Sequence, residues 1–119
     1  MLDKKIVIVD DDESIRKTFF LLLSDKYNVY LAGDAGEALA RFEKAPVDMI
    51  IADLRLPQKN GLQMIVDFRR SGYQGRIILI SACADQVKPE DLEKLGVDRL
   101  FIKPLDLKLL TDTIDSLLA

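Results

Sequence analysis

The sequence lacks several features that would assign it to common functional classes. It has no histidine, so no imidazole of this chain can act as a base, a metal ligand or a phosphate carrier. Its one cysteine, Cys83, cannot form an intrachain disulfide, which is typical of a protein from a reducing compartment. The 17 basic and 20 acidic residues give a formal net charge of -3, and this balance disfavours direct nucleic-acid binding by the domain.

Long apolar runs are also missing. Lys4 and Lys5 precede only four apolar residues, 6–9, a run far too short for a signal peptide or a membrane-spanning helix. We therefore expect a soluble, cytoplasmic protein that does not contact a membrane. The 119 residues, 49% of them hydrophobic, are enough for one domain, residues 1–119, with a substantial core.

Five short apolar runs alternate along the chain with five segments of helical periodicity. The runs are residues 6–9, 28–32, 49–52, 76–80 and 99–102. The helical segments are residues 13–25, 35–45, 62–70, 89–95 and 107–118, with Asp12, Asp34 and Asp106 as expected N-caps. We expect core-facing stripes on the first and last helices, namely Ile15, Phe19, Leu22 and Leu23, and Leu109, Leu110, Ile114, Leu117 and Leu118.

This alternation predicts an α/β domain built on a doubly wound, five-stranded parallel sheet. The expected strands are continuous apolar runs rather than alternating ones, as in a sheet covered by helices on both faces.

Four of the five expected strands end in a chemically active group. Asp10 and Asp11 follow the first strand, Asp53 the third, Ser81 the fourth and Lys103 the fifth. Because the strands are parallel, these groups share one edge of the sheet, and the topological switch point would bring them together.

Three carboxylates at one edge repel each other, so either a pKa rises or a cation neutralises them. An oxygen-only donor set favours Mg²⁺, whose charge with that of Lys103 would balance the three acids. Such a site suits attack on phosphorus, and a carboxylate such as Asp53 can carry a phosphoryl group. The Ser81 hydroxyl could then bind the added oxygens and reshape the loop that follows.

The motifs at these strand ends resemble those of a known family. They are VDDD at residues 9–12, D-x-x-L-P-x-x-N-G from Asp53 to Gly61, S-A at Ser81 and K-P at Lys103. In order and spacing they resemble the receiver domain of two-component response regulators over the whole chain. The resemblance implies a (βα)5 flavodoxin-like fold with strand order 2-1-3-4-5.

The resemblance also implies a role for each residue at the edge. Asp53 would be the phosphoacceptor and Ser81 the hydroxyl switch, while Lys103 would pair with the phosphoryl group. Mg²⁺ would be held by Asp10, Asp11, Asp53 and the backbone carbonyl of Arg55. The phosphoryl donor would be a phosphohistidine on a sensor histidine kinase or a phosphotransfer protein.

By the same resemblance the domain is a switch with slow self-catalysed phosphoryl transfer, not a metabolic enzyme. It would act on an effector domain or target protein through the fourth helix, fifth strand and fifth helix, a face that also serves for homodimers. One position departs from the family pattern: Leu100 stands where many receivers have Tyr or Phe. By strand alternation Phe101 points to the opposite face.

The same residues are also compatible with other functions. Each acid, hydroxyl or lysine alone could be an ordinary strand-end or helix-capping residue. An aspartyl-phosphate hydrolase of the haloacid dehalogenase kind would need a second Asp where Arg55 stands. A flavodoxin-like cofactor carrier would need a phosphate loop where the acidic triplet stands. A receiver that signals only by phosphorylation-independent contact stays an alternative.

Overall fold

The computed structural model describes residues 3–56, 59–83, 85 and 87–119. Its five strands are all parallel and lie in the order β2-β1-β3-β4-β5, which confirms the expected topology. The strands are β1 (Lys5–Val9), β2 (Asn28–Ala32), β3 (Met49–Asp53), β4 (Arg76–Ser81) and β5 (Arg99–Ile102).

A helix follows each strand, as the sequence predicted. The helices are α1 (Glu13–Leu23), α2 (Ala35–Lys44), α3 (Gly61–Arg70), α4 (Pro89–Leu95) and α5 (Leu107–Leu117). The carboxylates of Asp12, Asp34 and Asp106 accept a backbone N–H in the first turn of α1, α2 and α5, which confirms the expected caps. No helix of the described ranges is both long and apolar enough to cross a membrane.

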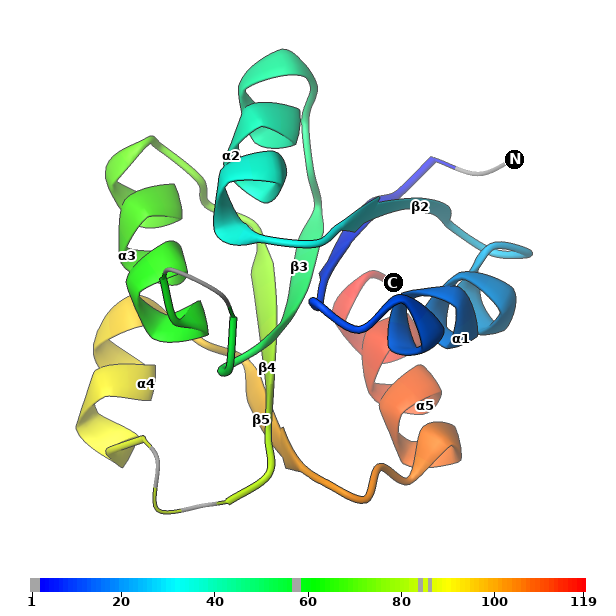
Figure 1. Ribbon diagram of the computed structural model, residues 1–119. Coiled ribbons are helices and arrows are strands. Elements are labelled where there is room, and N and C mark those ends of the chain that lie inside the picture. Colours follow the sequence, from blue (N-terminus) through cyan, green and yellow to red (C-terminus); the bar gives the residue numbers. More distant parts are fainter. Residues whose placement is uncertain (1–2, 57–58, 84, 86) are drawn as a thin grey trace.

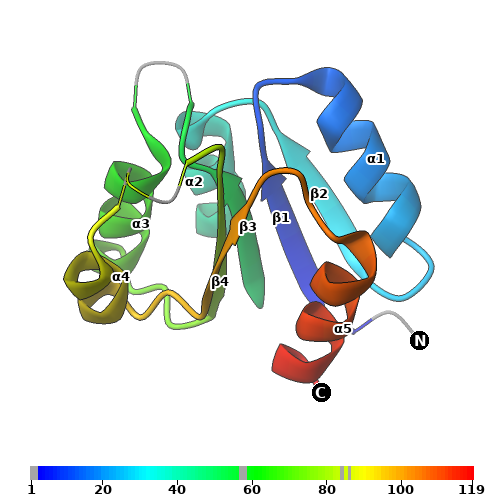
Figure 2. The same ribbon diagram turned by 90° about the horizontal axis from the view of Figure 1, so that it is seen from below.

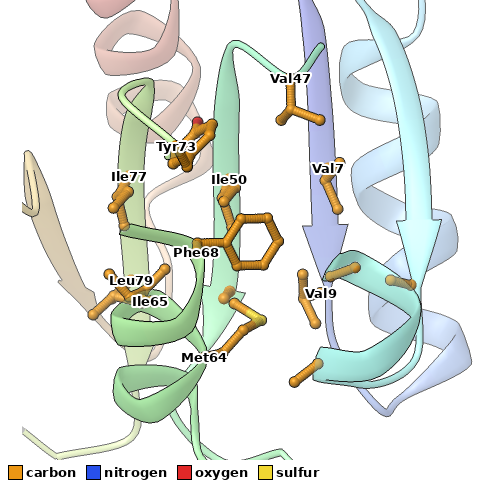
Figure 3. Close-up of a cluster of buried hydrophobic side chains, with 14 of the residues drawn as sticks. Val7, Val9, Val47, Ile50, Met64, Ile65, Phe68, Tyr73, Ile77 and Leu79 are labelled. Carbon is orange, nitrogen blue, oxygen red and sulfur yellow. The ribbon is translucent and has the colours of Figure 1, made fainter. Parts of the chain in front are cut away.

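The helices cover both faces of the sheet, as Figures 1 and 2 show. Helices α2, α3 and α4 pack on one face, and α1 and α5 pack on the other. On the first face, the rings of Phe42, Phe68 and Tyr73 contact one another, with centroids 5.4 to 5.7 Å apart. Figure 3 shows Phe68 of α3 lying against Ile50 of β3 at the centre of this layer.

Two of the expected core residues lie at the margin of their stripes instead. Leu22 of α1 is 36% exposed and Leu109 of α5 is 46% exposed, whereas Phe19 and Leu110 are buried. The expected apolar stripe was therefore wider than the face of each helix that the sheet covers. Pro57, where the sequence predicted a break after the third strand, lies outside the described residues.

Aspartates also fix the strands at their amino ends. The carboxylate of Asp48 accepts the N–H of Lys5, 2.8 Å away, and that of Asp98 accepts the N–H of Ile77, 2.9 Å away. The first bond joins β1 to the start of β3, and the second joins β4 to the start of β5. Strands β3, β4 and β5 end at the opposite edge of the sheet, the lower one in Figure 1.

Candidate functional site at the carboxyl edge of the sheet

Within the described ranges, only three polar or charged residues are buried, and all three lie at the carboxyl edge of the sheet. Asp10 is 4% exposed, Asp53 is 7% exposed and Ser81 is 1% exposed. They stand at the ends of β1, β3 and β4, which are neighbours in the sheet. Burying carboxylates costs free energy unless they are paired, so this concentration indicates a site rather than a contribution to stability.

Asp53 lies at the end of β3 and is held by two groups from different loops. Its Oδ1 accepts the N–H of Arg55 at 2.8 Å, and its Oδ2 accepts Nζ of Lys103 at 2.7 Å. The hydrogen bond to Asp53 raises the pKa of Lys103, so the lysine is a cation at neutral pH. The N–H of Lys103 donates to the Ser81 carbonyl at 2.8 Å, which ties this lysine to the end of β4.

Asp10 is the most deeply buried acid of the site. Desolvation raises its pKa, the N–H of Asp12 opposes this by donating to Oδ1 at 2.9 Å, and the charge of Asp53 raises it further. Asp11 is exposed and adds a smaller repulsion. The negative field of these acids would be relieved by a cation.

The described part of the carboxyl edge does not form a closed metal site by side chains alone. No group of three or more acidic, histidine or cysteine side chains in the described ranges converges closely enough to hold an ion. The donors at the edge are nevertheless oxygens, two of them on buried carboxylates, and Mg²⁺ needs only one or two carboxylates because it keeps several waters. The chemistry of the donor set therefore fits Mg²⁺.

Ser81 is the last residue of β4 and is next to the strand that carries Asp53. Its hydroxyl donates to the Cys83 carbonyl at 2.7 Å and accepts the N–H of Cys83 at 3.1 Å. In the sheet, Asp53 pairs with Ile80, the residue before Ser81. The hydroxyl thus links the edge of the site to the first residues of the β4–α4 loop.

Leu100 and Phe101 point to opposite faces of β5, as strand alternation predicted. Leu100 packs against the cluster of α2, α3 and α4, whereas Phe101 is buried in the cluster of α1 and α5. Leu92, Leu95 and Val97 pack against the same cluster, so the aliphatic Leu100 lies on the face of β5 that α4 also covers.

Two residues of the site were missed by sequence reasoning. Gly61 begins α3, and a Cβ there would lie 2.6 Å from the Asp53 carbonyl oxygen, so the helix can approach β3 only because it starts with glycine. The sequence contains Gly61 only as the last residue of the D-x-x-L-P-x-x-N-G motif, which does not indicate this close approach. Arg16 donates through Nη1 to the Asp10 carbonyl at 2.7 Å, and nothing in the spacing of the sequence indicates that contact.

Taken together, the edge presents a carboxylate whose oxygens are oriented by one backbone N–H and one ammonium. A second buried carboxylate stands beside it, and a hydroxyl ends the neighbouring strand. Such an arrangement can accept a group at Asp53 while balancing charge locally.

Comparison with known proteins gives a consistent result. A family model described as the response regulator receiver domain matches residues 6–115. The transcriptional regulatory protein CiaR of Streptococcus pneumoniae is 32% identical over 114 residues, which cover 96% of this chain and 51% of CiaR. The chain spans about half the length of the first curated relatives it matches.

Solved structures agree with the sequence matches. Chemotaxis response regulator CheY4 of Vibrio cholerae is 29% identical with a TM-score of 0.86, and the match covers 98% of this chain and 99% of that one. Response regulator protein TrrA of Thermotoga maritima, in complex with Mg(2+)-BeF, is 27% identical with a TM-score of 0.82, and 97% of this chain and 99% of that one are covered.

Proposed function

The chain belongs to the response regulator receiver domain family of two-component systems, and from that premise we propose that it is switched by phosphorylation of Asp53. The observation that carries the proposal is the 2.7 Å contact between Oδ2 of Asp53 and Nζ of Lys103 beside the buried Asp10. A carboxylate in this setting is oriented and only partly neutralised, as a nucleophile toward phosphorus requires.

The proposed reaction is transfer from a phosphohistidine on a sensor histidine kinase or phosphotransfer protein. A carboxylate oxygen of Asp53 attacks phosphorus, and the bond between phosphorus and the donor's imidazole nitrogen breaks. The electron pair of that bond returns to the nitrogen. Asp53 becomes an acyl phosphate, and Lys103 offsets part of its added charge.

Mg²⁺ is the proposed cofactor. Asp10, Asp11, Asp53 and the main-chain carbonyl of Arg55 would hold it, and when bound it would neutralise the acids and the phosphoryl oxygens. Two features support this assignment: the oxygen donor set, and the Mg(2+)-BeF complex of the similar protein TrrA.

The proposed switch is a change of partner at Ser81. Its hydroxyl now donates to the Cys83 carbonyl, and on phosphorylation it would donate to a phosphoryl oxygen instead. Cys83 would lose that bond, so the β4–α4 loop would move. In the described ranges α4 has no buried residue, which makes it easy to displace when the loop moves.

The remaining parts of the proposal concern the domain and its partners. Residues 1–119 form one cytoplasmic receiver domain, which works as a switch and not as a metabolic enzyme. Its output would reach an effector domain or target protein, or a second copy, through the face made by α4, β5 and α5. Leu100 at the α4 side of β5 implies that this output does not need an aromatic ring there.

Intact-mass measurement with a small phosphoryl donor tests the proposal. Acetyl phosphate or phosphoramidate with Mg²⁺ should add one phosphoryl group, about 80 Da, to the wild type and to Asp112→Ala but not to Asp53→Ala. Asp112 is a suitable control because it is an exposed acid whose ion pair, among the described residues, is with Lys108 alone. No gain in the wild type, under conditions that modify another receiver, would overturn the phosphoacceptor assignment and favour phosphorylation-independent contact.

A further inference from the structure

Arg16, in the first turns of α1, reaches back to the end of β1. Its Nη1 donates to the Asp10 carbonyl at 2.7 Å, while its own N–H donates to the Asp12 carbonyl at 3.1 Å. One residue therefore contacts the acidic triplet at both ends. It touches the backbone of these acids and forms no ion pair with their carboxylates within the described residues.

The loop after β2 provides the other wall around Arg16. A Cβ placed on Gly33 would lie 3.4 Å from Nη1 of Arg16 and 3.6 Å from Oε1 of Glu37. The N–H of Gly33 donates to Oε2 of Glu37 at 3.3 Å, which holds the glycine in this position. The guanidinium is thus confined between the ends of β1 and β2.

Hydrogen bonds hold the N–H, the carbonyl and the carboxylate of Asp10. Its N–H donates to the Ala32 carbonyl at 3.1 Å, its carbonyl accepts from Arg16, and its carboxylate accepts from Asp12. Of the three partners, only Arg16 uses a side chain. A substitution there removes one of the constraints while leaving the other two intact.

We propose that Arg16 is a positioning residue for the cation site: by holding the main chain of Asp10, it sets the direction in which the Asp10 carboxylate faces Asp53. This inference rests on the function proposed above, because it assumes that Asp10 binds Mg²⁺. Arg16 acts through Asp10 and is not itself a ligand. Groups that orient metal ligands from outside typically change metal affinity by one to two orders of magnitude when removed.

Three variants separate positioning from charge. Arg16→Met removes the bond and the charge, and Arg16→Lys keeps the charge with a single donor group. Lys17→Met removes the same charge from the next residue of α1, where Lys17 forms an exposed pair with Glu13 at 3.3 Å. Each variant is titrated with MgCl₂ by isothermal calorimetry, and its melting temperature is measured without metal.

If Arg16 positions Asp10, the three variants should differ in their Kd for Mg²⁺. Arg16→Met should raise the Mg²⁺ Kd about tenfold, Arg16→Lys should give an intermediate Kd, and Lys17→Met should stay close to the wild type. At saturating Mg²⁺ the rate of phosphorylation by acetyl phosphate should recover in Arg16→Met, because Asp53 and Lys103 are unchanged.

Other results would overturn the inference. Loss of a positive charge near a cation site strengthens cation binding by itself. If the Mg²⁺ Kd falls in both Lys17→Met and Arg16→Met, charge outweighs positioning and the inference is wrong. If Arg16→Met melts at a lower temperature but keeps the wild-type Kd, its role is structural. If Arg16→Met does not fold, a wild-type Kd in Arg16→Lys overturns the positioning role in the same way. A wild type that binds no Mg²⁺ would instead remove the proposed function itself.

Discussion

Nζ of Lys103 lies 2.7 Å from Oδ2 of Asp53, although the two residues are 50 positions apart in the sequence. The carboxylate is nearly buried, whereas the lysine side chain is partly exposed. The separation is set by the sheet, because β3 pairs with β4 and β4 with β5, and the N–H of Lys103 bonds to the last residue of β4. The pair therefore reports whether the carboxyl edge is intact.

Lys103→Met should destabilise the protein at neutral pH by about 1 to 2 kcal/mol, a value reduced because the lysine is partly solvated. The pKa of Lys103 is raised mainly by its hydrogen bond to Asp53. Its contribution to the free energy of unfolding is therefore fully present below the pKa of the unfolded state, and is lost as the pH rises through the pKa of the folded state. Urea unfolding should show a deficit at pH 7 that disappears at strongly alkaline pH. Lys108→Met, which breaks an exposed pair with Asp112, is the control and should change little. Equal stability of Lys103→Met and wild type would contradict the pairing.

Asp10→Asn should stabilise the protein at neutral pH, whereas Lys103→Met destabilises it. Burial and the charge of Asp53 raise the pKa of Asp10, so its carboxyl stabilises the fold below the unfolded pKa and this contribution is lost as the pH rises through the folded pKa. At pH 7 the wild type thus carries an unfavourable charge, which Asn removes while its amide oxygen can still accept the N–H of Asp12.

We expect the free energy of unfolding of Asp10→Asn at pH 7 to be about 1 kcal/mol higher than that of the wild type. We also expect this variant to bind Mg²⁺ more weakly. The gain should vanish below about pH 4, where the wild-type carboxyl is protonated in both states. Thermal unfolding from pH 3 to 8 measures it, with Asp11→Asn as the exposed neighbour that should gain less. A destabilised Asp10→Asn at pH 7 would show that its hydrogen bonds outweigh the repulsion.

Gly61→Ala tests whether the start of α3 supports Asp53. The new Cβ would lie 2.6 Å from the Asp53 carbonyl oxygen and 3.0 Å from Cα of Leu54, and backbone atoms cannot rotate away. We expect a loss of about 1 to 3 kcal/mol in unfolding free energy, together with slower phosphorylation because Asp53 shifts.

The matched control for this variant is Gly36→Ala, in the first turn of α2. Its Cβ would meet only the Asp34 carboxylate, at 3.4 Å, so it should gain helix propensity and stabilise slightly. Equal behaviour of the two variants in urea unfolding and in the phosphorylation assay would show that the close approach at Gly61 has no consequence.

Local patterns predicted the doubly wound parallel sheet and the convergence at its carboxyl edge, whereas the strand order came from the resemblance to the receiver family. Apolar runs ending in Asp53 and Ser81 identify parallel strands and the edge where they finish. The supporting contacts depend on distances in the folded structure, which the periodicity of the sequence does not encode. Arg16 reaches Asp10 across the start of α1, and Leu22 lies at the margin of its stripe, where packing decides which side chains are covered.

Arg69 is another such contact, and it joins three segments on the α3–α4 side of the sheet. From the last turn of α3, its Nε donates to the Leu95 carbonyl at 2.9 Å and its Nη2 to the Gly96 carbonyl at 3.2 Å, both at the end of α4. Its Nη1 donates to the carbonyls of Tyr73 and Gly75. At the other end of α4, the Lys88 side chain makes no capping bond.

Arg69→Met should therefore increase local opening of α4 more than global unfolding of the domain. Four carbonyl groups lose a charged donor, and we expect a loss of about 2 kcal/mol in unfolding free energy. Amide hydrogen exchange should accelerate in α4 and leave β1 and β3 unchanged, because local opening follows the loss of local contacts. Arg70→Met, at the exposed neighbouring position, is the control. Exchange in α4 that matches the control would mean that the apolar contacts of Leu92 and Leu95 alone hold this helix to α3.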